Sequence, residues 1–272
     1  MTVLQAIVLG LVQGFTEFLP ISSTAHLRIV PALLGWDDPG AAYSAVIQLG
    51  TVAAVVIYFA KDLGRITSAF VRGLMTKKPF ETPDSRLAWC VGLGTIPIGI
   101  AGLLLKKRIE TSFRSLWVIA IAMIVLGIVL FVVERVAAKK RVLSDVTVKD
   151  GVIVGLCQAV ALIPGSSRSG TTITGALLQG FTREDAARFS FLLSIPATAL
   201  AGVFELKHLM EAPDRPVMMM IIGTAVSFAS GLASIAFLLK LLRTRTLLGF
   251  VVYRLALGLL LIGLISTGRL AA

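Results

Sequence analysis

Apolar stretches of similar length recur along the chain, and short polar segments separate them. A helix needs about 20 residues to cross the hydrocarbon core of a bilayer. Six stretches are long and apolar enough to meet this requirement. We therefore predict transmembrane helices at Ala41 to Ala60, Leu87 to Leu105, Leu116 to Val133, Ala186 to Leu206, Val217 to Leu239 and Leu247 to Ser266.

Two further apolar stretches, Met1 to Leu34 and Gly151 to Gln179, are interrupted near the middle by proline, serine and a charged or titratable residue. Neither half of either stretch is long enough to span a bilayer alone. A broken helix is tolerated at membrane depth only where protein or a water-filled cavity satisfies the freed backbone groups. We interpret both stretches as re-entrant helical hairpins. The first arm of each has a GxxxG spacing, over 10–14 and 151–155, which favours close packing of helix backbones.

The two interrupted stretches also resemble each other in sequence. Residues 13–26 read QGFTEFLPISSTAH, and residues 158–170 read QAVALIPGSSRSG. The separation is 145 residues between the two glutamines that begin these segments, and 144 between the two prolines. This is a weak internal repeat with a slip of one residue, and its period is half the chain.

The order of the predicted elements indicates how the two halves are related. Each hairpin precedes three predicted spans, so the second half would enter the membrane in the opposite direction from the first. This pattern predicts an all-α polytopic membrane protein with an inverted-topology repeat, as in secondary transporters. We divide the single membrane domain, residues 1–272, into pseudo-repeats 1–134 and 150–272 joined by a basic loop, 135–149.

Composition supports a membrane protein and excludes other classes. Hydrophobic residues make up 56% of the chain and charged residues 15%, with a mean hydropathy of +0.90. Soluble domains carry about 25% charged residues. The net charge of +11 does not indicate nucleic-acid binding, because the chain has no soluble domain for such a site. The first ten residues lack the features of a signal peptide, so we expect them to belong to the folded protein.

The distribution of lysine and arginine predicts an orientation in the membrane. If the polar loop from Lys61 to Arg86 is cytoplasmic, sixteen of the 26 cations lie on that side and eight on the other. The positive-inside rule then places both termini outside. The remaining two cations, Arg168 and Arg254, lie within apolar segments. Arg254 is near the start of its span, and we interpret it as reaching the interface by snorkelling.

Ionisable residues inside apolar segments are the candidates for chemistry, because they are costly in a bilayer and normally face a cavity and a partner. In the first hairpin these residues are Glu17 and His26, and Gln13 lies one turn before Glu17 on the same helix face. The helix that follows Pro20 can be capped by one of three hydroxyls, Ser22, Ser23 or Thr24. A capped helix start offers free N–H groups to a phosphate. The alternative is that these hydroxyls bond only to their own backbone and that His26 is a buried hydrogen-bonding residue.

The second hairpin combines a helix break with a permanent positive charge. Pro164 and Gly165 end one helix, Ser166 or Ser167 can cap the next, and Arg168 carries a guanidinium suited to phosphate oxygens. Residues 165–172, GSSRSGTT, approach the phosphate-binding loop of nucleotide-binding proteins, but Thr171 stands where lysine is required. The loop also lacks a strand–helix context, so we predict no nucleotide site. If the two tips meet, anion binding comes from the second hairpin and acid–base chemistry from the first.

These two segments resemble the signatures of a known family, the undecaprenyl-diphosphate phosphatases linked to bacitracin resistance. Residues 13–26 resemble its first motif, [E/Q]-G-x-T-E-F-L-P-[IV]-S-S-T-x-H, and residues 164–170 resemble its second, P-G-x-S-R-S-G. Length and hydropathy extend the resemblance over essentially the whole chain. Members are multi-pass enzymes of the bacterial cytoplasmic membrane that remove one phosphate from the lipid carrier of peptidoglycan synthesis.

The resemblance implies roles for particular residues and a cofactor. Glu17 corresponds to an essential acidic residue, His26 to a catalytic residue, Ser23 to a nucleophile or polar partner, and Arg168 to the diphosphate ligand. Substrate contacts are expected from the remaining motif residues, namely Gln13, Ser22, Thr24, Gly165, Ser166, Ser167, Ser169, Gly170 and Thr171. The family's site is expected to face the periplasm and to use a divalent cation, Mg²⁺ or Ca²⁺. Many members have glutamate where this chain has Gln13, and an amide is a poorer ligand for such a cation, so Glu17 is the expected metal ligand.

The sequence predicts a phosphatase that converts a polyprenyl diphosphate to the monophosphate and inorganic phosphate. The attacking group can be Ser23, His26 or water. The main alternative is a transporter or flippase for an anion or a lipid phosphate, because such proteins share the inverted-repeat architecture. A lipid phosphatase of the acid phosphatase superfamily fits poorly, since the chain has two histidines and lacks that motif order. A homodimer is an arrangement that the sequence leaves open.

Overall fold

The computed structural model describes residues 1–210 and 217–271, and the elements found there are helices. Their order is α1 (Val3–Phe18), α2 (Ser23–Leu34), α3 (Gly40–Tyr58), α4 (Ala60–Met75), α5 (Pro83–Glu110), η1 (Ser112–Arg114), α6 (Leu116–Val136), η2 (Leu143–Asp145), α7 (Val148–Val160), α8 (Arg168–Leu178), α9 (Arg183–Met210), α10 (Val217–Leu242) and α11 (Leu248–Ser266). The labels η1 and η2 denote single 3₁₀ turns.

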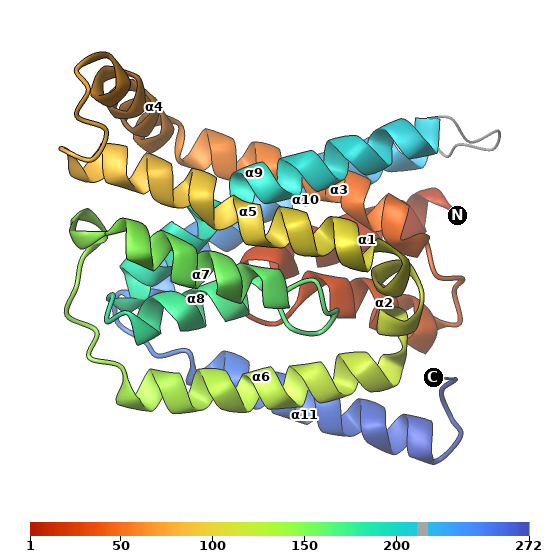
Figure 1. The fold of residues 1–272 in the computed structure, drawn as a ribbon. Coiled ribbons are helices and arrows are strands. Elements are labelled where there is room, and N and C mark those ends of the chain that lie inside the picture. Colours follow the sequence, from red (N-terminus) through yellow and green to blue (C-terminus); the bar gives the residue numbers. More distant parts are fainter. Residues whose placement is uncertain (211–216, 272) are drawn as a thin grey trace.

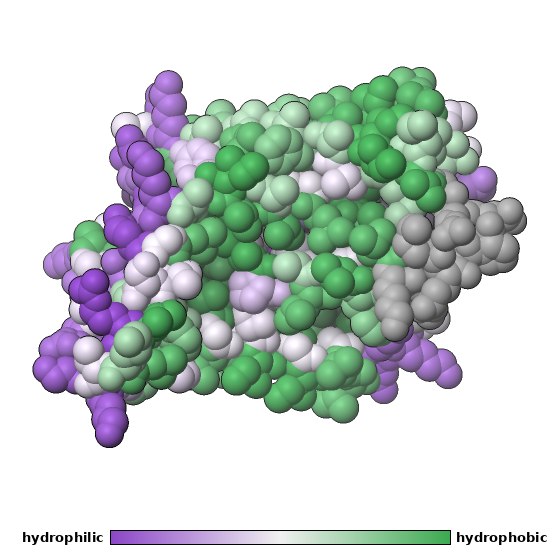
Figure 2. All heavy atoms as spheres, turned by 90° about the horizontal axis from the view of Figure 1, so that it is seen from above, coloured by the Kyte–Doolittle hydropathy of each residue, from purple (hydrophilic) through white to green (hydrophobic). Residues whose placement is uncertain are grey.

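The six predicted spans are confirmed as long apolar helices. Within the described residues, six helices are long and apolar enough to cross a membrane: α3, α5, α6, α9, α10 and α11. Viewed from above, an apolar band occupies the middle of the molecule and charged side chains gather at its ends (Figure 2). The coarse prediction of an all-helical polytopic membrane protein is therefore correct.

The two interrupted stretches form helix–loop–helix units. Helices α1 and α2 are separated by the loop 19–22, and α7 and α8 by the loop 161–167. Both loops lie near the centre of the fold, and the N- and C-termini lie at the same end (Figure 1). The packing partners follow a pattern: α1 packs on α10, α7 packs on α5, α3 packs on α9, and α6 packs on α11.

Glycines allow the first arm of each helix–loop–helix unit to approach a long helix closely. A Cβ atom on Gly155 would lie 2.5 Å from Gly94 Cα, and one on Gly10 would lie 2.7 Å from Gly223 O. Side chains at these positions would force the helix pairs apart. The predicted close packing at the two GxxxG spacings is confirmed.

Replacing Gly94 by valine is expected to destabilise the α5–α7 contact by about 1–3 kcal/mol, the usual cost of overpacking. A Cβ at this position would lie 2.8 Å from Gly151 O, which is backbone and cannot rotate away. At Gly99, five residues along the same helix, a Cβ would have no neighbouring atom within 4 Å, so Gly99→Val supplies the matched control. The midpoint of thermal unfolding in detergent should fall for Gly94→Val alone, and equal midpoints for both variants would contradict this account.

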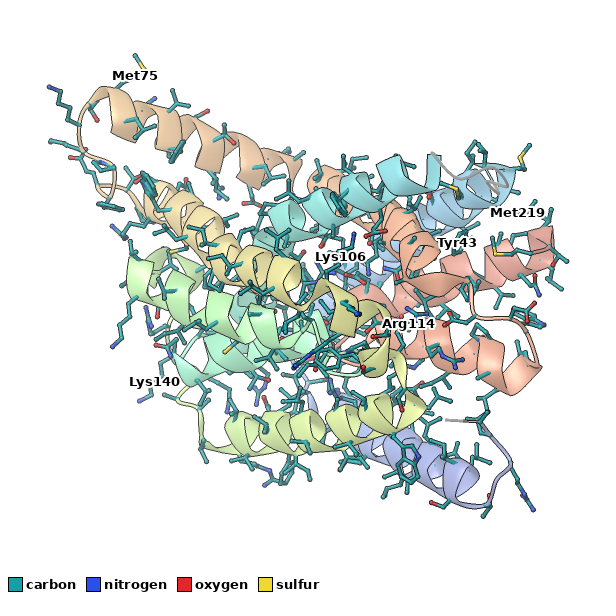
Figure 3. The ribbon with its side chains drawn as sticks, turned by 45° about the vertical axis from the view of Figure 1, so that its right-hand side comes forward. Tyr43, Met75, Lys106, Arg114, Lys140 and Met219 are labelled. Atoms are coloured by element: carbon teal, nitrogen blue, oxygen red, sulfur yellow. The ribbon has the colours of Figure 1, made fainter. Side chains whose placement is uncertain are left out.

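The polar segment from Lys61 to Arg86 was expected to be a loop, and this prediction is wrong. Helix α4 occupies much of it and lies at one end of the molecule (Figure 1). It is amphipathic: Ile66 and Gly73 are buried, whereas Met75 at its tip is 81% exposed (Figure 3). Its charged face lowers its mean hydropathy below that of a span, which is why a search for apolar stretches misses it.

Candidate active site

The loops 19–22 and 161–167 end in the same helix cap. Ser22 begins α2 with φ of 77° and its Oγ accepts from Ala25 N, while Ser167 begins α8 with φ of 68° and its Oγ accepts from Gly170 N. Each capping hydroxyl also bonds the hydroxyl two residues on: Ser22 with Thr24 at 3.1 Å, and Ser167 with Ser169 at 3.2 Å. Ser22 and Ser167 are structurally equivalent and lie 145 residues apart, the same separation as the two glutamines. The two prolines, 144 residues apart, are therefore offset by one position from this equivalence.

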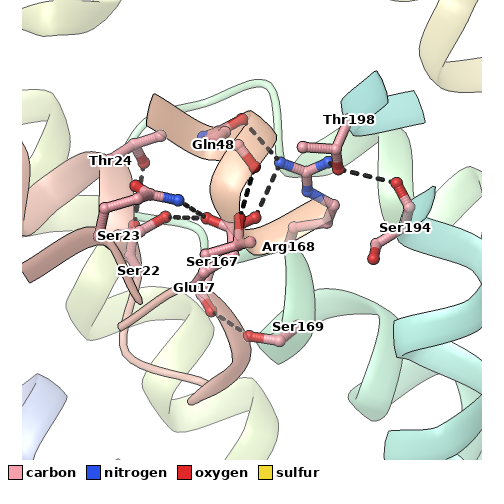
Figure 4. Close-up of polar contacts among 12 residues, drawn as sticks. Glu17, Ser22, Ser23, Thr24, Gln48, Ser167, Arg168, Ser169, Ser194 and Thr198 are labelled. Carbon is pink, nitrogen blue, oxygen red and sulfur yellow. Dashed lines mark hydrogen bonds and ion pairs between the residues drawn. The ribbon is translucent and has the colours of Figure 1, made fainter. Parts of the chain in front are cut away.

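Glu17, in the last turn of α1, is the centre of a polar cluster (Figure 4). Its Oε2 accepts hydrogen bonds from Ser23 Oγ at 2.5 Å and from Gln13 Nε2 at 2.8 Å. Its Oε1 accepts from Arg168 Nη2 at 3.1 Å, and the Glu17 side chain is only 7% exposed. A hydroxyl and a carboxylate at this distance have the arrangement of a nucleophile and its base.

Arg168, the first residue of α8, brings the second helix–loop–helix unit into contact with the first. Besides Glu17, its guanidinium donates to Gln48 Oε1 at 3.4 Å and to the hydroxyl of Thr198. Ser169 Oγ donates to Leu19 O at 2.9 Å, which ties the two loops together. The structure thus brings together Glu17, Ser23 and Arg168, as the sequence predicted.

His26 lies near these residues in the chain but has different partners. Its Nδ1 is 2.7 Å from Ser22 O, and its Nε2 is 2.6 Å from the hydroxyl of Tyr253, with which the ring also stacks. Both ring nitrogens are therefore engaged away from Glu17 and Ser23. This geometry suits a residue that holds the start of α2 against α11.

Arg254 was predicted to snorkel towards the interface, and this prediction is wrong. Its side chain is fully buried. The guanidinium donates to five backbone carbonyls, those of Pro20, Ala122, Met123, Gly165 and Ser166, at 2.9 to 3.4 Å. Both loops leave carbonyls without helical partners, and a guanidinium with five N–H donors can satisfy them. The position of Arg254 along its helix did not reveal that it faces inward.

Four other predicted contact residues, Gln13, Gly165, Ser166 and Thr171, do not line the small chamber and instead support the residues that do. Gln13 is fully buried and supports Glu17. Gly165 has φ of +92° and lies so close to α6 that a Cβ would be 2.5 Å from Ile119 O. Thr171 Oγ1 donates to the backbone of Arg168, and Ser166 contributes its carbonyl to Arg254. Gly165, Ser166 and Thr171 thus shape the loop and the start of α8.

Two neighbouring hollows surround the polar cluster. A chamber of about 30 Å³, room for roughly one water, is lined by Glu17, Ser22, Ser23, Thr24, Ala161, Ser167 and Arg168. A cavity of about 550 Å³ shares Thr24, Ala161 and Arg168 with it and extends between α5 and α9 along apolar residues that include Ile98, Leu103, Leu200 and Phe204. The surface on the side of α5 and α9 is hollowed near its centre (Figure 2). A polar chamber thus opens into an apolar cavity of ligand size.

Three residues that contact the predicted site residues were not anticipated from the sequence: Gln48, Thr198 and Tyr253. Gln48 and Thr198 are buried polar residues in α3 and α9, and both bind Arg168. A polar partner for Gln48 could have been predicted from the sequence, because an amide inside an apolar span normally has a polar partner across a helix interface. Tyr253 adjoins Arg254, and nothing in the sequence links it to His26.

The side chains that could ligate a metal limit how a divalent cation could be held. Among the described residues, no group of three histidine, cysteine or acidic side chains is placed to ligate a metal. The small chamber offers one carboxylate, Glu17, and four hydroxyls. Mg²⁺ commonly binds one or two carboxylates together with substrate phosphates. The residues fit a cation shared with a phosphate ligand and do not form a complete protein cage.

Together the helices and the site define a polytopic membrane protein with a buried carboxylate, hydroxyl and guanidinium beside an apolar cavity. The model of the family described as bacitracin resistance protein BacA matches residues 6–260, and the chain belongs to this family.

Relatives of full length agree with this assignment. An undecaprenyl-diphosphatase from Myxococcus xanthus (strain DK1622) is 65% identical over 272 residues, which cover 100% of this chain and 92% of that protein. An undecaprenyl-diphosphatase from Chloroherpeton thalassium is 53% identical, with 100% of both chains covered. Undecaprenyl-diphosphatase 2 from Streptomyces coelicolor is 48% identical, with 98% of this chain and 96% of that protein covered.

Proposed function

We propose that this chain hydrolyses undecaprenyl diphosphate to undecaprenyl phosphate and inorganic phosphate. The observation that carries the proposal is the contact of Glu17 with both Ser23 and Arg168. A carboxylate beside a hydroxyl supplies a base and a nucleophile, and a guanidinium supplies the charge that binds a phosphoryl group. The names of the relatives point to the same substrate.

The cavities suggest how the substrate is held. The lipid tail would lie in the large cavity between α5 and α9, against apolar residues that line it. The diphosphate would reach the small chamber, where Arg168 and the N-terminal ends of α2 and α8 face it. To bind there, a phosphate must replace Glu17 as a partner of Arg168. Substrate binding would therefore free Glu17 to accept a proton.

The reaction then follows from the positions of Ser23 and Glu17. Ser23 Oγ transfers its proton to Glu17 and attacks the terminal phosphorus, so an O–P bond forms at Ser23. The bond from that phosphorus to the bridging oxygen breaks, and undecaprenyl phosphate leaves with the proton. Water then hydrolyses the phosphoserine, which regenerates Ser23 and releases phosphate. Arg168 stabilises the charge on the transferred group in both steps.

A divalent cation fits this scheme as a partner of the substrate. Glu17, which lines the small chamber, would hold it together with the two phosphates of the ligand. When bound, such a cation neutralises part of the negative charge on the diphosphate.

We also propose that the two helix–loop–helix units are re-entrant and that the halves 1–134 and 150–272 are inverted repeats. Support comes from the corresponding helix pairs, the matching caps at Ser22 and Ser167, and the central position of both loops (Figure 1). The end with the loops 76–82, 137–147 and 243–247 is rich in cations, which favours the cytoplasmic side of the inner membrane. The cavity would then open towards the periplasmic side, where Arg28 and Arg114 line it.

Phosphate release from undecaprenyl or farnesyl diphosphate by the purified protein in detergent tests the function. We expect turnover by the wild type, and a loss of at least about 100-fold in Ser23→Ala, since the nucleophile is removed. Ser194→Ala is the matched control, because its hydroxyl bonds Phe191 O in its own helix. Transport of a lipid phosphate without phosphate release would favour the flippase alternative, and full activity of Ser23→Ala would favour attack by water.

A further inference from the structure

A second group of cations lines the same cavity as Arg168. Arg28 comes from α2, Lys106 from α5 and Arg114 from η1, and all three contribute to the wall. Lys106 and Arg114 lie near each other where α5 ends (Figure 3). The cavity therefore has one cation at its polar chamber and three more towards the end of the molecule that holds both termini (Figure 1).

Asp38, in the loop between α2 and α3, joins two of these cations. Arg114 Nη2 lies 2.6 Å from Asp38 Oδ1 and 2.7 Å from Oδ2, and Arg28 Nε lies 3.5 Å from Oδ2. One carboxylate is thus shared by two guanidinium groups, which leaves a net positive charge. Arg28 approaches Asp38 through Nε and lines the cavity, so its terminal nitrogens remain able to bind an anion there.

The charge of Asp38 keeps this arrangement together at neutral pH. Burial raises the pKa of Asp38, but hydrogen bonds from Arg114 and the charges of Arg114 and Arg28 outweigh it and hold the pKa below its usual value. A carboxyl group with a lowered pKa in the folded protein stabilises the fold above its unfolded pKa. That contribution is lost as the pH falls through the folded pKa, so the two arginines are held together throughout the neutral range.

One face of α2 connects the chamber that holds Arg168 with the second group of cations. Thr24 lines both the small chamber and the large cavity, and Arg28 lies one helical turn further on the same face. Much of the remaining wall is apolar. An anion that leaves Arg168 meets a costly apolar passage, and a cationic site at its far end would lower that cost.

We propose that Arg28 and Arg114, oriented by Asp38, form a second phosphate-binding site that receives the inorganic phosphate released beside Arg168. This inference rests on the proposed function. A planar guanidinium with free terminal N–H groups matches the oxygens of phosphate. The site would make phosphate release a stepwise movement over one turn of α2.

Binding of inorganic phosphate to the purified protein, followed by phosphorus NMR titration without substrate, tests the proposal. We expect two sites in the wild type. In each of Arg28→Gln and Arg114→Gln, one site should be unchanged and the affinity of the other should fall by about ten-fold or more. Arg168→Gln should also keep one site, which is the one at Arg28. Arg108→Gln is the matched control, because Arg108 lies near the same end of α5 but is exposed and does not line the cavity.

Inhibition by inorganic phosphate provides a second measurement. Arg28→Gln and Arg114→Gln should each raise the phosphate concentration needed for half-inhibition by about ten-fold, and Arg108→Gln should not. Unchanged phosphate binding in both Arg28→Gln and Arg114→Gln would overturn the proposal, even if the enzyme turns over normally. Phosphate binding that depends on Arg28 in a protein without turnover would instead count against the proposed function alone.

A lipid headgroup could offer the same phosphate chemistry, and nanodiscs distinguish the two sources. With inorganic phosphate as the occupant, its affinity should be the same in discs with and without phosphatidylglycerol. If phosphatidylglycerol displaces inorganic phosphate from the wild type but has no such effect on Arg28→Gln, the site belongs to lipid headgroups and the proposal is overturned.

Discussion

Replacing Glu17 by glutamine is expected to lower kcat for diphosphate hydrolysis by about three orders of magnitude, within the range for loss of a general base. Glutamine has nearly the same shape, and its Oε1 can still accept from Ser23 or Arg168, the partners of Glu17. It cannot take the Ser23 proton. The loss should therefore appear in kcat, with a much smaller change in KM.

The large cavity next to the polar chamber contains another glutamate, Glu205, which serves as a control for the Glu17 variant. Glu205 lines the large cavity in α9 but is not part of the polar cluster around Arg168. Glu205→Gln removes the same charge from the cavity that adjoins the polar chamber, so it should retain most of the activity. Equal losses in both variants would mean that activity depends only on negative charge near the site, and the role of Glu17 as a base would have to be abandoned.

The sequence was sufficient to predict the spans and the two breaks because both depend on local physical chemistry. Apolar length predicts a span, and proline followed by serine predicts a break and a cap. The cap itself was left open among several hydroxyls, and Ser22 and Ser167 are the ones used. Helix α4 was missed because its alternating charged and apolar residues fall below the hydropathy of a span.

A contact between distant segments could be predicted only where a residue would carry an unpaired charge in apolar surroundings, because such a charge costs free energy unless it has a partner. Glu17 and Arg168 are charged residues in apolar surroundings, so each needed a partner, and they are partners of each other. Gln48 and Thr198 are polar but uncharged, and nothing in their local sequence states which residue they would meet. The charge of Arg254 was evident from the sequence. Whether its side chain reaches the membrane interface or the protein interior depends on the rotation of α11 about its axis, and the local sequence does not give that rotation.

The matching caps at Ser22 and Ser167 present different side chains, and the proposed function gives these two side chains different tasks. At a separation of 145 residues, Ser23 in the first half is equivalent to Arg168 in the second. Each directly follows a capping serine with positive φ, so the cap presents both side chains at the start of a helix. The first helix start thereby offers a hydroxyl beside Glu17, and the second offers a guanidinium. The two caps have the same geometry, and under the proposed function this one difference gives the first helix start the nucleophile and the second the phosphate ligand.

Replacing Arg254 by methionine is expected to destabilise the protein by about 3 kcal/mol or more, because each buried carbonyl that is left without a donor costs about 1–3 kcal/mol. The change removes the Arg254 donor from five carbonyls, and three of these lie in the loops that carry Ser22 and Ser167. Thermal unfolding in detergent measures the effect, and phosphate release at a temperature where the variant is folded measures the effect on the site. Because both caps depend on these loops, activity should fall in the folded variant as well.

Two further variants separate this role of Arg254 from a general need for positive charge. Arg254→Lys keeps the charge but has three N–H donors in place of five, so its stability should lie between those of the wild type and the methionine variant. Arg243→Met removes an exposed arginine, 66% accessible and paired with Glu184, and should cost less than about 1 kcal/mol. If Arg254→Met were as stable as Arg243→Met, the carbonyls of the two loops must have other donors, and Arg254 would not be the residue that holds both helix starts in place.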